Sequence, residues 1–322
     1  MENTEKSYIY SPVKQTKLYC YESLLNFFIE AFNKDLLPNK ILLSGKSGIG
    51  KETFAYHLIN FILSKDEKYS YDIKNLEINS LNKSYKLINQ NCHPNFFLIE
   101  NLTGKSSINI EQVRNMINYA NKTAYNNKKK FILINNSEFL NLNSINALLK
   151  IVEEPGSNTN FILIHNSSNI ISKTLKSRCI EFKVFFDKSS KNKILNKILS
   201  QYQIDFDPDL IDKIISYYDT PGTILNILDL IDIGILDKTN INLQNIISKL
   251  IEYNLKNRNN SNLTLLQNII EIFYYKKLSL SENKNVVLKN YSNTLKQIDL
   301  FKRYNIDMVN VFYEIKQNII HG

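Results

Sequence analysis

The sequence has few cysteines and no long apolar run. Its three cysteines, Cys20, Cys92 and Cys179, lie far apart in 322 residues and form no Cys-x-x-Cys pair. This spacing argues against a disulfide framework and against a four-ligand zinc site. No apolar run approaches the roughly 18 residues of a membrane-spanning helix, and the N-terminus lacks the apolar core of a secretory signal. We therefore expect a soluble cytoplasmic protein with no bound metal and no membrane partner.

The chain also lacks an acidic excess. It has 40 Lys and Arg against 31 Asp and Glu, which gives a formal net charge of +9. This charge is compatible with an anionic partner such as nucleic acid. A general bias toward Lys, Asn and Ile would give the same charge, and the basic clusters at 128–130 and 188–193 are short enough to be ordinary solvated surfaces. Composition leaves both alternatives open.

Glycine is scarce as well, so the place where it gathers is informative. Three of only eight glycines fall within the stretch Gly45-Lys46-Ser47-Gly48-Ile49-Gly50-Lys51. This is the G-x-x-x-x-G-K spacing of a phosphate-binding loop. The stretch follows an expected strand and precedes an expected helix, an arrangement that directs backbone N–H groups and a helix N-terminus at phosphate. We predict that residues 45–53 descend from a nucleotide-binding loop.

The residues that would hold magnesium and support hydrolysis are missing. The position after Lys51 needs Ser or Thr as a metal ligand but carries Glu52, and Thr53, one residue further on, is turned by about 100° on a helix. A neighbouring expected strand ends in Asn135 and Asn136, where an acid would be needed. Asparagine lacks the anion that holds the metal or accepts a proton. We predict a degenerate site that binds ATP or ADP weakly at most.

In the first half of the chain, short apolar runs alternate with helical patterns. The runs are continuous, which is typical of strands buried on both faces of a parallel sheet. Strands are expected at 40–44, 95–100, 130–135, 160–165 and 179–185. Helices are expected at 51–64, 108–124 and 142–154. This order predicts an α/β fold with helices on both sides of an open parallel sheet.

Strand patterns end near residue 186, and the rest of the chain is helical in pattern. Three short helices are expected at 187–202, 207–218 and 220–231, followed by longer amphipathic stretches. We predict three domains: an α/β domain at 1–186, a small helical lid at 187–234 and an all-helical domain at 235–322.

Two other groups of residues are not expected to carry chemistry. Glu153 and Glu154 are adjacent on an expected helix and point about 100° apart, so helix termination before Pro155 explains them better than shared acid–base work. His57 and His93 have no Ser or Cys partner at motif spacing, so we expect packing or surface roles for them.

Five ordered blocks of sequence carry a family resemblance. They are LLSGKSGIGKETFAYHLINFIL at 42–63, HPNFFLIE at 93–100, KFILINNSEFLNLNSINALLKIVEEP at 130–155, NFILIHNSSNIISKTLKSRC at 160–179 and TPGTILNILDL at 220–230. Together they resemble the delta-prime subunits of bacterial DNA polymerase III clamp loaders, which are AAA+ proteins. The resemblance implies delta and gamma/tau subunits as partners in a hetero-oligomeric ring. It also implies a sliding clamp and primer-template DNA engaged through the complex, and a C-terminal collar domain that oligomerises.

The resemblance implies roles for single residues too. In the Ser-Arg-Cys motif, Arg178 is implied to be an arginine finger that reaches the ATP site of the adjacent subunit. The family's sensor asparagine falls near Asn166. An arginine that follows the glycine of the TPG motif in the family is replaced here by Thr223, which removes another nucleotide contact. Only Cys92 remains of the cysteine cluster that binds zinc in many relatives, so zinc is not expected.

These expectations describe a DNA polymerase III holoenzyme subunit with little or no ATPase of its own. Two alternatives stay open. The first is an active AAA+ motor subunit that hydrolyses ATP at its own loop. The second is a stand-alone nucleotide-binding module that joins no ring.

Overall fold

The computed structural model describes residues 11–101, 107–156, 158–201, 220–232, 234–236, 242–257, 263–304 and 308–320. The chain divides into two compact units. The first comprises 1–101, 107–204 and 220–222, and the second comprises 102–106, 205–219 and 223–322. The predicted lid is thus shared between the two units, and its helix at 207–218 lies outside the described residues. The three-domain boundaries stay predictions.

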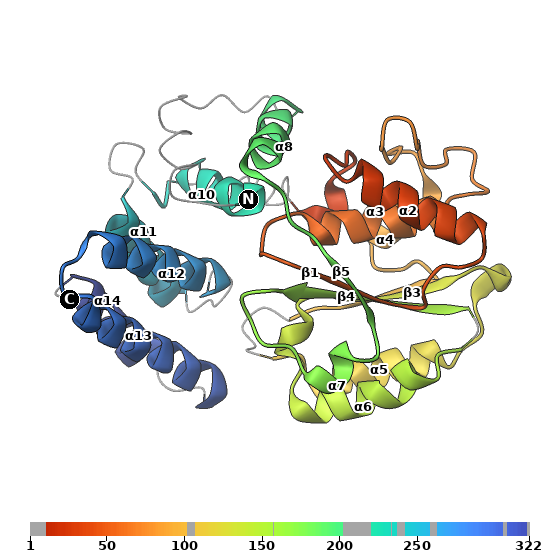
Figure 1. The fold of residues 1–322 in the computed structure, drawn as a ribbon. Helices are drawn as coiled ribbons and strands as arrows, with labels where there is room; N and C mark the ends of the chain where they lie inside the picture. The colour runs from red at the N-terminus through yellow and green to blue at the C-terminus, as the bar shows by residue number, and fades with distance from the viewer. Residues whose placement is uncertain are drawn as a thin grey trace. The chain divides into compact units, whose positions relative to one another are not determined.

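The first unit is built around a five-stranded parallel sheet (Figure 1). Its strand order is β2-β3-β4-β1-β5. The strands are β1 (Lys40–Gly45), β2 (Phe96–Ile99), β3 (Lys130–Ile134), β4 (Thr159–Asn166) and β5 (Ile180–Lys183). All five predicted strands are confirmed, and so is the α/β fold with a parallel sheet.

The central strands are apolar along their length because both of their faces are covered. Leu42, Ile132 and Phe161 belong to the core on one side of the sheet. Their chain neighbours Leu43 and Leu133 belong to the core on the other side. Side chains alternate between the faces of a strand, so a strand covered twice reads as a continuous apolar run.

Helices cover both faces of this sheet, as Figure 1 shows. On one face lie α2 (Glu22–Asn33), α3 (Lys51–Leu63) and α4 (Lys83–Asn89), and on the other lie α5 (Ile110–Ala120), α6 (Leu142–Glu153) and α7 (Lys173–Lys176). Short 3-10 helices are η1 (Pro12–Lys14), η2 (Tyr125–Asn127) and η3 (Ser137–Phe139). The first unit also contains α8 (Lys188–Gln201). The predicted helices at 51–64, 108–124, 142–154 and 187–202 are therefore confirmed.

Hydrogen bonds made by polar side chains, to one another and to backbone N–H groups, hold the segment between α3 and β2. Glu67 accepts hydrogen bonds from the backbone N–H groups of Lys83 and Ser84 and from the Ser84 hydroxyl. That hydroxyl lies 3.2 Å from Nε2 of His93, whose Nδ1 accepts a hydrogen bond from the Asn95 N–H at 3.1 Å. Both ring nitrogens of His93 are therefore engaged within the chain, as the predicted packing role requires. The expected absence of zinc stays a prediction.

His57 on α3 is a second histidine with two protein partners. It is fully buried, its Nε2 lies 3.0 Å from the carbonyl oxygen of Gln15 and its Nδ1 lies 2.9 Å from the Tyr71 hydroxyl. A carbonyl can only accept, so Nε2 carries the proton and Nδ1 accepts from Tyr71. Burial lowers the pKa of His57 to about 4, and the imidazole is neutral in the folded chain.

We expect His57 to make the fold sensitive to acid. Between its usual pKa of about 6.5 and the folded value of about 4, the unfolded chain binds a proton that the folded chain does not. The free energy of unfolding should therefore decrease as the pH is lowered through this window, by about 1.4 kcal/mol per pH unit for this one histidine. Urea denaturation at a series of pH values measures the slope. His57→Gln should reduce this slope by the contribution of one proton, whereas Tyr71→Phe should leave the slope unchanged. Equal slopes for wild type and His57→Gln would contradict the assignment.

The second unit is helical in its described ranges. It contains α11 (Leu243–Asn257), α12 (Leu263–Leu280), α13 (Lys284–Tyr304) and α14 (Met308–Ile320), while α10 (Pro221–Asp232) begins in the first unit and continues in the second. The predicted all-helical C-terminal region is confirmed. None of the helices in the described ranges combines the length and the apolar character needed to cross a membrane.

Candidate functional site

The glycine-rich loop connects the carboxyl end of β1 to the first turn of α3, as the sequence predicts. Gly48 has φ 74° and Gly50 has φ 96°, both in the left-handed region that favours glycine. Lys51 begins α3 directly after Gly50. The geometry is that of a phosphate-binding loop, with a helix N-terminus at its end. Lys46, Ser47, Ile49 and Thr53 occupy the loop and the first turn as predicted from the motif, and their role in binding stays a prediction.

Lys51 is hydrogen-bonded within its own loop. Its ammonium donates to the carbonyl oxygens of Gly45 and Lys46, each at 2.7 Å. Burial lowers the pKa of Lys51 to about 8, while the nearby carboxylates of Glu138 and Glu52 raise it. A phosphate group would have to compete with two carbonyl oxygens for this ammonium.

Glu52 and Asn135, at the two positions that hold magnesium in an active site, are hydrogen-bonded to each other. The Asn135 side-chain amide donates to Oε2 of Glu52 at 2.8 Å. Burial raises the pKa of Glu52 to about 7; Glu100 adds to this increase, while the Asn135 hydrogen bond and Lys51 oppose it. In active enzymes of this type, a hydroxyl and a carboxylate at these positions hold magnesium. The residues present do not fit a magnesium nucleotide, and the described part of the chain contains no group of three His, Cys, Asp or Glu side chains that could hold a metal.

Asn166 lies beside the start of the glycine loop. It is the last residue of β4 and pairs in register with Gly45 of β1. Its backbone N–H donates to Oε2 of Glu138 at 3.2 Å, and Oε1 of Glu138 accepts from the Asn169 side chain at 3.2 Å. The structure thus brings the predicted sensor residue to the glycine loop. Glu138 is an addition to the predicted site, and its signal in the sequence is that it is the first carboxylate after β3.

The chain reverses direction at Asn136, directly after β3. Asn136 has φ 51°, a left-handed conformation that asparagine adopts more readily than most residues, and η3 follows it. Asn135 is buried and faces Glu52, whereas Asn136 forms the turn. Of the two asparagines predicted to mark the degenerate position, Asn135 is the one in contact with the loop helix.

The TPG motif makes a backbone contact with the glycine loop. The N–H of Gly222 donates to the carbonyl oxygen of Gly48 at 2.8 Å. A Cβ atom at Gly222 would lie 2.8 Å from both Cα and the carbonyl oxygen of Gly48, so this approach requires glycine. Thr223, the next residue, is buried and belongs to the second unit.

Arg178 lies at the opposite end of the sheet from the glycine loop. It precedes β5, in which Ile180 pairs with Ile41 near the amino end of β1, whereas the loop follows Gly45 at the carboxyl end. Four residues of strand separate the two ends, which is about 13 Å. Arg178 is therefore remote from the loop of its own chain, and the structure does not join these two predicted parts of the site.

The guanidinium of Arg178 has defined partners within the chain. Its Nε donates to Oε1 of Glu153 at 2.7 Å, one terminal nitrogen also contacts this carboxylate, and the other donates to the carbonyl oxygen of Thr174 at 2.8 Å. The Arg178 side chain remains 33% exposed. Glu153 is the last residue of α6, which ends before Pro155 as predicted. A role for Glu153 beside Arg178 was not predicted, because the two residues are 25 positions apart.

Comparison with known proteins places these features in a family. The family described as DNA polymerase III, delta subunit, matches residues 21–188, which are 168 of the 322 residues. The chain belongs to this family. The match covers the glycine loop, Asn135, Asn166 and Arg178, whereas the TPG motif lies outside it.

Among similar proteins, the delta' subunit of DNA polymerase III from Pseudomonas aeruginosa is 31% identical to this chain, over 44% of this chain and 41% of that protein. The gamma subunit from Buchnera aphidicola subsp. Schizaphis graminum is 29% identical, over 68% of this chain and 59% of that protein. The chain thus spans about half the length of these relatives. Among solved structures, a gamma subunit-related protein from Thermotoga maritima is 12% identical, with a TM-score of 0.42 over 92% of this chain and 99% of that one.

Proposed function

We propose that this chain is a delta-prime-like subunit of a DNA polymerase III clamp loader, with little or no ATP hydrolysis of its own. It would assemble with delta and gamma/tau subunits in the cytoplasm. Through the complex it would act on a sliding clamp and primer-template DNA. In this ring, Arg178 would serve the ATP site of a neighbouring subunit, and the helices of the second unit would join the collar.

The observation that carries this proposal is the hydrogen bond between Asn135 and Glu52. It occupies both positions that an active site needs for magnesium, while Lys51 is held by loop carbonyls. Arg178 supports the second half of the proposal. A guanidinium that is remote from its own loop and partly exposed would be able to stabilise charge on a phosphate of another chain.

The purified chain tests the first half of the proposal. We expect ATP turnover at the level of the background, and Lys51→Ala should leave it unchanged. Turnover that disappears with Lys51→Ala would instead support the alternative of an active motor subunit. Size measurement with candidate partner subunits separates a ring component from a stand-alone module, since a module would stay monomeric in their presence.

We expect Glu153 to position Arg178. Glu153→Ala should leave assembly intact and lower the neighbour's ATP hydrolysis by about tenfold, less than the loss of Arg178 itself, because the guanidinium keeps its charge but loses two of its contacts. The effect should fall on kcat rather than on KM. Glu153→Gln should rescue part of the activity, since its amide oxygen can still accept from Nε.

The matched control is Glu154→Ala. Glu154 is the adjacent exposed carboxylate and follows the end of α6. It should leave the neighbour's hydrolysis within about twofold of wild type. Equal losses from the two substitutions would remove the special role of Glu153.

A further inference from the structure

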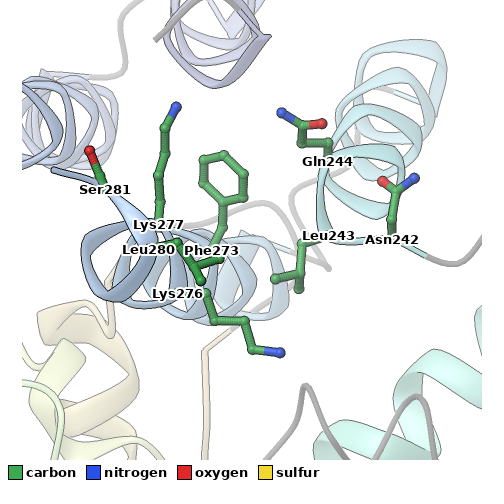
Figure 2. A pocket seen from close by; sticks show the side chains of 8 residues that line it. All are labelled: Asn242, Leu243, Gln244, Phe273, Lys276, Lys277, Leu280 and Ser281. Carbon is green, nitrogen blue, oxygen red and sulfur yellow. The ribbon is translucent and has the colours of Figure 1, made fainter.

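The second unit contains a groove that shares no residue with the candidate site of the first unit. The groove has a volume of 460 Å³ and is formed by the N-terminal end of α11 and the C-terminal end of α12, with Ser281 beyond it (Figure 2). This volume falls within the range of sites that bind small molecules. Its lining includes Leu243, Phe273 and Leu280 as apolar residues.

The apolar part of the groove has a buried base and an exposed edge. Leu243 and Phe273 are each 8% exposed, whereas Leu280 is 86% exposed. Covering such an exposed leucine with another apolar surface lowers the free energy. The groove can therefore accept an aliphatic or aromatic side chain.

The polar part of the groove is positively charged. Lys276 and Lys277 line it, and Figure 2 shows their side chains pointing to opposite sides of α12. The Lys277 ammonium lies 5.6 Å from the centre of the Phe273 ring, which holds the charge beside the apolar base. None of the described residues that line the groove is acidic.

Helix α11 adds to this positive field. It begins at Leu243, on the wall of the groove, and the Asn242 side chain caps it by accepting from the N–H of Asn245 at 2.7 Å. A helix of 15 residues carries a partial positive charge at its N-terminus. Lys277 and a helix N-terminus therefore lie beside an apolar base, and Lys276 adds positive charge on the other side of α12.

We propose that this groove docks an acidic amphipathic segment of a partner protein. An aliphatic or aromatic side chain of that segment would lie on Leu243, Phe273 and Leu280, and its carboxylates would pair with Lys276 and Lys277. Charge complementarity selects this occupant. A second copy of this chain is disfavoured, because each copy carries a formal net charge of +9.

The test uses the full chain and three fluorescein-labelled twelve-residue peptides. The first repeats Leu-Glu-Asp-Phe, the second replaces Glu and Asp by Lys, and the third replaces Leu and Phe by Ser. Fluorescence anisotropy should show binding of the first peptide only, weakening as salt screens the charges. A labelled single-stranded twelve-nucleotide DNA, added in the same way, tests the other anionic class.

Substitutions then locate the binding. The double change Lys276→Glu and Lys277→Glu should weaken binding of the first peptide by about tenfold, and Leu280→Asp by about fivefold. The control is Lys284→Glu with Lys289→Glu, the same charge change at two exposed positions of α13. It should stay within about twofold of wild type.

The proposal is overturned if the lysine or serine peptide binds as well as the first one, if the α13 control weakens binding equally, or if Leu280→Asp has no effect. It is also overturned if the DNA binds more tightly than the first peptide and loses its binding in the same variants. Leu280→Asp changes an exposed side chain, so it remains informative if the double lysine variant fails to fold. None of these outcomes depends on ATP hydrolysis or on Arg178.

Discussion

Replacing Arg178 by alanine should lower ATP hydrolysis at the neighbouring site by about 10³-fold, the lower end of the effect known for arginine fingers. The physical reason is that the guanidinium of an arginine finger neutralises charge that develops on the transferred phosphoryl group. In the proposed ring, hydrolysis at ATP sites that Arg178 does not serve would hide part of this loss. The measurement should therefore use a reconstituted complex in which all ATPase subunits except the neighbour carry an inactivated loop lysine.

Two control variants test whether the loss of hydrolysis is specific to the Arg178 guanidinium. Arg114→Ala removes an exposed arginine from α5, within the same unit, and should leave hydrolysis unchanged. Arg178→Lys keeps the charge but loses the planar fork, so it should restore only a small part of the rate. Size-exclusion chromatography should show normal assembly for all three variants. Unchanged hydrolysis in an assembled Arg178→Ala complex would rule out the finger.

The sheet was predictable because burial on both faces of a strand produces a recognisable pattern in the local sequence. The ends of four of the five strands were predicted to within one residue, since each is a continuous apolar run. The fifth was predicted to extend to Phe185, but β5 ends at Lys183 and Phe185 is 82% exposed. β5 is an edge strand, so only one neighbour holds it, and apolar residues alone do not determine where it ends.

Helix α2 was not predicted, although its sequence contains a signal. Leu25, Phe28 and Ile29 are buried at helical spacing, and Glu22 stands in the first turn. The Phe28 ring lies 4.7 Å from the ring of Phe182 in β5, centre to centre. A pattern search that includes residues before the first strand would find this helix.

The contacts that define the candidate site could not be predicted in the same way. The Asn135–Glu52 hydrogen bond joins residues 83 positions apart, and the Gly222–Gly48 contact joins the TPG motif to the glycine loop. Residue types indicated that these positions had lost their usual chemistry. They did not indicate that the substituted residues bond to each other, because that depends on how the strands are paired.

The Asn135–Glu52 bond leads to the second large prediction, a gain of binding. The double change Glu52→Thr with Asn135→Asp should tighten binding of magnesium-ATP by roughly 10- to 100-fold, which corresponds to about 1.4–2.8 kcal/mol. It removes a carboxylate from the position beside the phosphates and supplies a hydroxyl and an acid where magnesium is held in active relatives of this type. Titration with a fluorescent ATP analogue, in magnesium and in EDTA, measures it.

The single changes separate charge removal from metal binding. Glu52→Gln keeps an oxygen that accepts from Asn135 and removes the anion, so it should improve binding slightly and equally in magnesium and in EDTA. Asn135→Asp alone places a second carboxylate next to Glu52, whose pKa is already raised to about 7, and should weaken binding. If the double variant binds no better in magnesium than in EDTA, the two positions do not form the lost metal site. The gain in affinity of the double variant should exceed the sum of the effects of the two single changes, because neither residue alone can hold the metal.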